Sequence, residues 1–168
     1  LGTKRIVVGD TLLARFNEDE TMFVVAHELG HYVAYDVWRL VAAGTLAAGA
    51  LFFGGRALAE RPDRSLATTA GLARLAFATS IVGLGLGPLL AAFSRSRERA
   101  ADRFALEAGS APAAGIAAFE RLREANLAED EQPLWMEVLF ASHPSLRRRI
   151  ERLRAALRAN EAPPTSVR

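Results

Sequence analysis

The chain has 168 residues, of which 51% are hydrophobic and 24% charged, a balance that predicts one folded unit and excludes an intrinsically disordered chain. Its basic and acidic residues are interspersed and give a formal net charge of only +2, so nucleic acid is not an expected partner. Because the sequence contains no cysteine, disulfides and thiolate metal sites are excluded, and any metal must be held by His, Asp or Glu.

The N-terminal segment predicts a short strand followed by a helix. Residues 4–9 (KRIVVG) are rich in β-branched side chains and precede Asp10, which is typical of a strand that ends in a turn. Asn17, with Glu20 three positions later, forms a capping pattern, and the acidic run from Glu18 suits the N-terminal end of a helix. We therefore expect a helix from about Glu18 through the motif HELGH.

The stretch VVAHELGHYVAYD, residues 24–36, carries two of the three histidines of the chain. Residues four positions apart lie about 40° apart around a helix, so His27 and His31 project side by side and can bind one metal ion. Glu28 is then placed to take a proton from water, as in HExxH metalloproteases. The alternative is a pair of surface or core histidines without a metal.

Two apolar runs follow. Residues 40–55 contain no charged side chain in 16 positions, and residues 75–93 contain none in 19. A membrane span needs roughly 17–25 residues, so we favour a transmembrane hairpin with residues 56–65 (RALAERPDRS) at its tip. The alternative is a buried helical hairpin in a soluble, all-α protein.

Polarity returns after the second run. Residues 94–109 (SRSRERAADRFALEAG) predict a third, polar helix with Gly109 as its C-terminal cap. Further helices are expected over residues 112–126 and 135–140 and then from about residue 146, where Leu146, Ile150, Leu153 and Leu157 keep helical spacing. The tail, residues 161–168, is expected to be frayed.

A catalytic zinc ion takes three protein ligands and leaves a fourth position for water, so His27 and His31 need a further ligand. The longer pattern HExxHxxGxxH is not present, because Ala34 and Val37 stand where it has glycine and the third histidine. A carboxylate or His143 therefore remains as the source of the third ligand.

Glu98 and Asp102 are the carboxylates that the third helix offers. They are four residues apart and share one helix face, where their repulsion of roughly 0.2–0.5 kcal/mol would be relieved by a cation. A hairpin that crosses the membrane and returns would bring this helix back to the side of HELGH. The alternative is that neighbouring arginines neutralise both acids as ordinary surface pairs, the candidates being Arg95, Arg99 and Arg103.

Five segments and the two apolar runs between them carry a family resemblance. In chain order the five are KRIVVGDTLL, DETMFVVAHELGHYVAYD, SRSRERAAD, NLAEDEQPLW and SHPSLRRRI. From about Lys4 to Leu153 they resemble the type I CAAX prenyl endopeptidase family of membrane zinc metalloproteases. HELGH is shared by many metalloproteases, but its combination with SRxxExxxD and SHP across a membrane hairpin is much more specific.

The resemblance implies a role for each matched residue. His27, His31 and Glu98 would be the ligands of one Zn²⁺ ion, and Glu28 the general base. Asp102 would be a second acid that donates a proton or orients a histidine. His143 would assist catalysis at the transition state. A further residue, Arg149, would bind the substrate through an oxyanion or a carboxylate.

The resemblance also implies the fold: mainly α, a zincin-like metalloprotease domain with a short N-terminal β segment and a transmembrane hairpin inserted between the zinc-ligand helices. One domain is expected over 1–168, comprising the strand and HExxH helix (1–37), the hairpin (38–93), the third-ligand and C-terminal helices (94–160) and the tail (161–168). The chain starts at Leu1 without a signal-peptide pattern and lacks the family's earlier membrane helices, so we expect a piece of a longer protein.

The expected function is zinc-dependent peptide hydrolysis at a membrane. The partners would be membrane lipid and a peptide or protein substrate, which the family resemblance suggests carries a C-terminal lipid. Arginines after the second apolar run favour a zinc site on the cytoplasmic side. Two alternatives stay open: a quality-control protease that cleaves unfolded membrane proteins, and a non-catalytic membrane module with a structural zinc ion.

Overall fold

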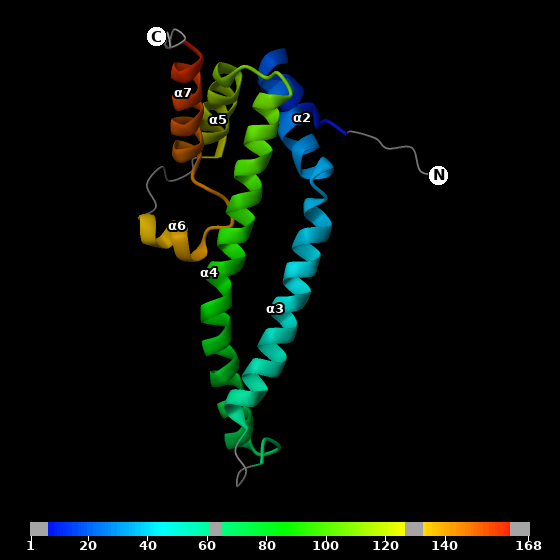
Figure 1. Cartoon of the computed structure of the whole chain (residues 1–168), viewed down its shortest axis with the longest axis vertical. Coiled ribbons are helices and arrows are strands. Elements are labelled where there is room, and N and C mark those ends of the chain that lie inside the picture. Colours follow the sequence, from blue (N-terminus) through cyan, green and yellow to red (C-terminus); the bar gives the residue numbers. More distant parts are fainter. Residues whose placement is uncertain (1–6, 61–64, 127–132, 162–168) are drawn as a thin grey trace, which may run out of the picture. The chain divides into compact units, whose positions relative to one another are not determined.

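The computed structural model describes residues 7–60, 65–126 and 133–161, and every regular element among them is an α-helix. Figure 1 shows the helices in chain order. They are α1 (Asp10–Arg15), α2 (Glu18–Val33), α3 (Asp36–Ala59), α4 (Thr69–Glu107), α5 (Pro112–Asn126), α6 (Leu134–Phe140) and α7 (Leu146–Glu161). The mainly α fold expected from the sequence is confirmed.

The predicted N-terminal strand is not seen, and this prediction was wrong for the residues that the structure describes. Residues 4–6 lie outside the described part, residues 7–9 form no strand, and Asp10 begins α1 instead of ending a strand. A strand must pair its backbone groups with a neighbour, and no second strand exists in the described ranges. Val7, 89% exposed, has no apolar surface against which to pack. The β-branched composition alone was therefore insufficient.

Helix α2 begins as predicted. The Asn17 side chain accepts a hydrogen bond from the backbone N–H of Glu20 at 2.9 Å, and the Glu20 carboxylate accepts one from the backbone N–H of Asn17 at 3.0 Å. This reciprocal capping satisfies two helix-terminal donors. Glu20 is only 2% exposed and also pairs with Arg121 of α5, 2.8 Å away. The cap therefore fixes the start of the helix that carries HELGH.

Helices α3 and α4 form the two arms of a hairpin (Figure 1). Both are long and apolar enough to cross a membrane by length and composition. Large apolar side chains on them are exposed, among them Leu46 at 75%, Phe53 at 70% and Leu84 at 71%. Part of the predicted tip, residues 61–64, lies outside the described residues.

The polar segment after the second apolar run is not a separate helix, which corrects the prediction. Helix α4 runs from Thr69 to Glu107 with Pro88 inside it. It continues past the apolar run because residues 89–108 contain no glycine or proline. It ends where predicted: Gly109 has φ 98°, and the N–H of Ser110 donates to the carbonyl of Ala105 at 3.1 Å. The two predicted acids therefore lie on the same helix as an apolar run.

The chain divides into two compact units. The first comprises Leu1–His31, Arg99–Gln132 and Pro144–Arg168; the second comprises Tyr32–Glu98 and Pro133–His143. In the first unit the buried core contains Phe23 of α2, Ala105 of α4, Ala114 and Phe119 of α5, and Ile150 and Leu153 of α7.

The core of the first unit explains why its helices pack. The rings of Phe23 and Phe119 meet edge to face at 5.5 Å between centroids. Ile150 and Leu153 are each 2% exposed, as the predicted apolar spacing of this helix requires. The helices predicted over 112–126 and 135–140 are confirmed as α5 and α6. Of the expected frayed tail, only Glu161 is described, and it closes α7.

Candidate metallopeptidase active site

The two histidines of HELGH meet on one side of α2, as their spacing predicts. Their ring centroids are 4.8 Å apart, with the ring planes at 89°. Their approach to α4 depends on Gly30, where a Cβ atom would lie 3.1 Å from both the Cα of Ala101 and the Cβ of Phe104. A glycine at this position therefore lets α2, which carries HELGH, and α4 pack closely.

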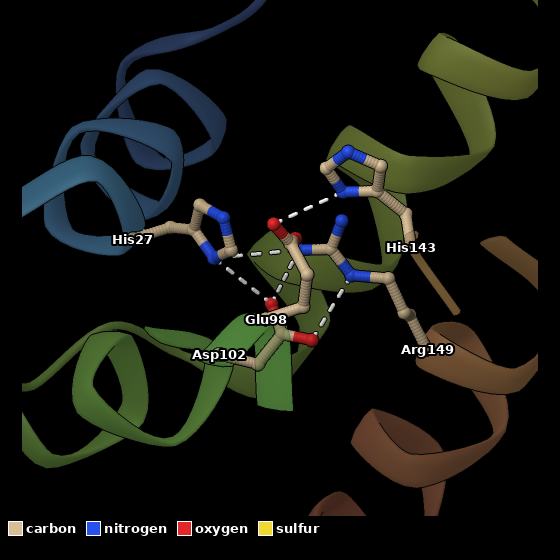
Figure 2. Close-up of polar contacts among 5 residues, drawn as sticks. All are labelled: His27, Glu98, Asp102, His143 and Arg149. Carbon is tan, nitrogen blue, oxygen red and sulfur yellow. Dashed lines mark hydrogen bonds and ion pairs between the residues drawn. The ribbon is translucent and has the colours of Figure 1, made fainter. Parts of the chain in front are cut away.

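His27 contacts a buried ion pair formed by Asp102 of α4 and Arg149 of α7. The Oδ1 atom of Asp102 lies 3.0 Å from His27 Nδ1, and Arg149 donates to both Asp102 oxygens, at 2.5 and 3.0 Å. Figure 2 shows Asp102 between the imidazole and the guanidinium. Arg149 also lies over the ring of Phe119, 4.0 Å from its centroid. His27, Asp102 and Arg149 are all less than 10% exposed.

This contact fixes which ring nitrogen of His27 is available to a metal. Two groups meet this nitrogen: Asp102 Oδ1 at 3.0 Å and Arg149 Nη2 at 3.3 Å. An ionised carboxylate is only an acceptor, so the shorter contact requires the proton on Nδ1, which then donates to Asp102. The lone pair is then on Nε2, the arrangement that a carboxylate imposes on a metal-binding histidine. Asp102 thus lies in contact with His27, and its two predicted roles, donating a proton or orienting a histidine, stay predictions.

Asp102 stays ionised in this setting. Burial by itself raises the pKa of a carboxyl group, but here hydrogen bonds from His27 and Arg149 and the positive charge of Arg149 outweigh burial. The pKa of Asp102 is consequently held below its ordinary value of 3.8. At neutral pH the group is a full negative charge, which is what holds the imidazole proton on Nδ1.

Glu98 precedes Asp102 by one turn of the uninterrupted helix α4, so both carboxylates project from the same side of it. Both are buried, Glu98 at 7% and Asp102 at 9% exposure, so they are not ordinary surface pairs. His143 lies with its Nδ1 3.0 Å from Glu98 Oε1 (Figure 2). His27, His31 and Glu98 are a group of three side chains that could hold one metal ion.

The remaining predicted site residues differ in their surroundings. Glu28 is exposed on α2, next in sequence to His27. His143 follows α6 and its side chain is 66% exposed, so it is open to a substrate as well as to Glu98. Arg149, by contrast, is 8% exposed and faces Asp102.

Sequence reasoning did not find the position of Arg95. Its guanidinium donates to three backbone carbonyls at the end of α6, those of Glu137 at 2.9 Å, Val138 at 2.9 Å and Ala141 at 2.6 Å. Arg95 is 8% exposed and lies one turn before Glu98. Backbone carbonyls have no residue signature, so no sequence pattern could reveal this contact. It fixes the segment that leads to His143.

Known proteins resemble the chain over nearly all of its length. The model of peptidase family M48 matches residues 1–157. An uncharacterized metalloprotease of Bacillus subtilis, YhfN, is 29% identical over 88% of this chain and 37% of its own length. Protease HtpX of Cellvibrio japonicus is 34% identical, covering 89% of this chain and 56% of its own.

A plant relative bears the name that the predicted resemblance suggested. CAAX prenyl protease 1 homolog of Oryza sativa subsp. japonica is 36% identical over 90% of this chain and 37% of its own length. The chain thus spans between 37% and 56% of the length of these three relatives. The family resemblance inferred from the motifs is confirmed: the chain belongs to peptidase family M48.

Proposed function

We propose that the chain forms the catalytic part of a membrane-embedded zinc metalloendopeptidase. The observation that carries this proposal is the orientation of His27 by the buried pair of Asp102 and Arg149. A metal-binding histidine almost always donates its other ring N–H to a carboxylate, a carbonyl or water, so this contact fits a metal ligand. Membership of peptidase family M48 supports the same conclusion.

The proposed ligands of one zinc ion are His27, His31 and Glu98. Two imidazoles and one carboxylate are a donor set of catalytic zinc sites, and they leave a fourth position for water or substrate. The charges fit as well, because two buried carboxylates one turn apart on α4 are stabilised by a nearby cation. When bound, the zinc ion would supply positive charge that acidifies water and polarises the peptide carbonyl.

The side chains of the site would then move and hold protons. Glu28 would take a proton from the attacking water and pass it to the leaving amine. Asp102 would keep the His27 proton on Nδ1, and Arg149 would hold Asp102 in place. This positioning role for Arg149 has more support than the predicted substrate contact, since its guanidinium is buried. His143 would donate a hydrogen bond near the reacting carbonyl.

The test of the general base is Glu28→Gln, measured as peptide cleavage and zinc content. The amide cannot accept the proton, so we expect cleavage to fall about 10²–10⁴-fold while zinc stays bound. Glu107→Gln, which neutralises an exposed acid at the end of α4, is the matched control and should cleave like the wild type. Wild-type cleavage by Glu28→Gln with zinc bound would disprove the mechanism.

The ligand set is tested separately by Glu98→Ala. Loss of the third ligand should abolish stoichiometric zinc binding, measured by metal analysis after dialysis. The exposed Glu107→Ala, on the same helix, should retain zinc. Full zinc occupancy in Glu98→Ala would remove Glu98 from the ligand set and leave the family assignment intact.

The substrate is proposed from the relatives. The name of the rice relative, CAAX prenyl protease 1 homolog, supports a peptide with a prenylated C-terminus. The alternative is an unfolded membrane protein cleaved for quality control. Incubating the chain with one substrate of each kind decides between them: cleavage of the prenylated peptide alone supports the first, and cleavage of the unfolded protein alone the second.

We further propose that α3 and the apolar part of α4 span a membrane, with the zinc site on the cytoplasmic side. Exposed apolar side chains along both helices support the span. Arg95, Arg97 and Arg99 follow the second apolar run and support the orientation. Modification of a cysteine introduced near Arg99, by a reagent that cannot cross the membrane, tests the side.

A further inference from the structure

Helix α6 has an inverted pattern of burial. Six of its seven residues are apolar and all six are exposed, namely Leu134, Trp135, Met136, Val138, Leu139 and Phe140. Their exposure runs from 37% for Met136 to 63% for Phe140. The one charged residue, Glu137, is 5% exposed. A helix at the surface of a water-soluble protein would instead bury its apolar side chains and expose its charged ones.

From this pattern, we propose that α6 lies in the surface of the lipid bilayer, with its apolar side chains among the lipid headgroups and upper acyl chains. The inference rests on the proposed membrane span of α3 and α4. It adds a lipid contact that belongs to neither span, made by the helix that leads directly into His143.

The contacts of Arg95 indicate where α6 lies along the length of α4. The apolar run of α4 ends at Phe93, and two residues correspond to a rise of about 3 Å along a helix. Arg95 donates to the carbonyls of Glu137, Val138 and Ala141, so the C-terminal end of α6 is held near the end of the apolar run. Figure 1 shows α6 beside α4. That level is the boundary between hydrocarbon and water.

The composition of α6 suits this boundary. Tryptophan is enriched at membrane interfaces, and Trp135 is 57% exposed. A seven-residue helix is too short to span the bilayer, but an apolar helix can lie in its surface. The exposed apolar side chains of α4, such as Leu89 at 66%, continue towards the same level, so lipid around the span reaches α6 as well.

The bilayer contact would hold the segment after α6 close to the membrane. His143 is only three residues beyond Phe140, and its ring contacts Glu98. A substrate anchored in lipid would therefore meet the proposed catalytic groups at the bilayer surface, without leaving the membrane.

Fluorescence quenching in reconstituted vesicles tests the position of α6. The chain has two tryptophans, so Trp38→Phe leaves Trp135 as the only one. The vesicles contain phosphatidylcholine with bromine either near the headgroup end of the acyl chains or near their tips, and bromine quenches only on contact. We expect Trp135 to lose most emission in the first lipid and little in the second.

A second tryptophan probe, placed in the apolar run of α4, tests the membrane span separately from the lipid contact of α6. In Trp38→Phe/Trp135→Phe/Leu84→Trp the only tryptophan replaces an exposed leucine of the α4 apolar run. It should show the reverse order, with most quenching from bromine near the chain tips. If this probe is quenched and Trp135 is not, α6 does not contact lipid and the inference is wrong, while the span stands.

The two other outcomes are equally informative. If neither tryptophan is quenched, the membrane span itself is disproved and the lipid contact of α6 with it. If Trp135 is quenched most by bromine near the chain tips, α6 lies within the hydrocarbon and the surface placement is wrong.

Discussion

At the scale of single residues, the sequence predicted that Asp102 shares a helix face with Glu98 but left two roles open for it. Its spacing from Glu98 indicated a shared helix face, and the structure adds the contacts with His27 and Arg149. Arg149 is one of five arginines in the run LRRRIERLR, residues 146–154, so its residue type alone does not distinguish it from its neighbours. Its burial and its contacts with Asp102 and Phe119 distinguish it in the structure.

The Asp102–Arg149 pair should contribute measurably to stability. Arg149→Met leaves the Asp102 carboxylate buried without its strongest donor, and breaking such a pair costs roughly 3–5 kcal/mol. We therefore expect a marked fall in the free energy of unfolding, measured by denaturant titration. The neighbouring Arg147→Met, at an exposed position, should change it by less than about 0.5 kcal/mol. Equal effects of both substitutions would refute the pairing.

The same comparison has a defined pH dependence. Because the folded-state pKa of Asp102 is lowered, its contribution is fully present above its unfolded pKa of about 3.9 and is lost as the pH falls through the folded value. The stability difference between wild type and Arg149→Met should therefore be constant near neutral pH and shrink in acid. A difference that grows towards acid pH would contradict this sign.

At the scale of elements, the sequence located the helices better than their continuity. Apolar periodicity and caps predicted α2, α5, α6 and α7, since these signals are local. A change from apolar to polar composition after Phe93 suggested a new helix, yet composition does not end a helix when no breaker is present. The continuity of α4 is what ties Glu98 to an apolar run.

The close approach of α2 to α4 depends on Gly30, which has no side chain. In Gly30→Ala the added Cβ would lie 3.1 Å from the backbone of Ala101, and overpacking of this kind costs roughly 1–3 kcal/mol. We expect lower stability and weaker zinc binding, because both histidines would shift relative to Asp102. Gly44→Ala on α3, where a Cβ meets nothing within 4 Å, is the control and should lose neither. Unchanged zinc affinity in Gly30→Ala would show that this close approach does not position the site.

At the scale of the molecule, the two compact units differ in what they bury. The first has an apolar core around Phe23, Phe119 and Ile150. The second exposes large apolar side chains along α3, α4 and α6, as expected of a unit whose solvent is lipid. Whether the whole 1–168 chain acts as the single domain expected from the sequence stays a prediction.

Metal removal separates a catalytic from a structural zinc ion. The first unit is held together by its apolar core and by the Asp102–Arg149 pair, neither of which includes a metal ion. A chelator should therefore stop peptide cleavage and leave the helical circular dichroism unchanged. Re-addition of zinc should restore cleavage. Unfolding on chelation would favour the alternative of a non-catalytic module with a structural zinc ion.

The sequence by itself determined the family, the mainly α architecture, the two apolar helices and the candidate ligands. These follow from periodicity and motif spacing, which are local properties of the chain. Only the tertiary structure decided that Asp102 contacts His27, that Arg149 is buried and that Arg95 binds the carbonyls of α6. Each of these depends on side chains or carbonyls more than 40 residues apart meeting in space, and their sequence positions carry no record of that meeting.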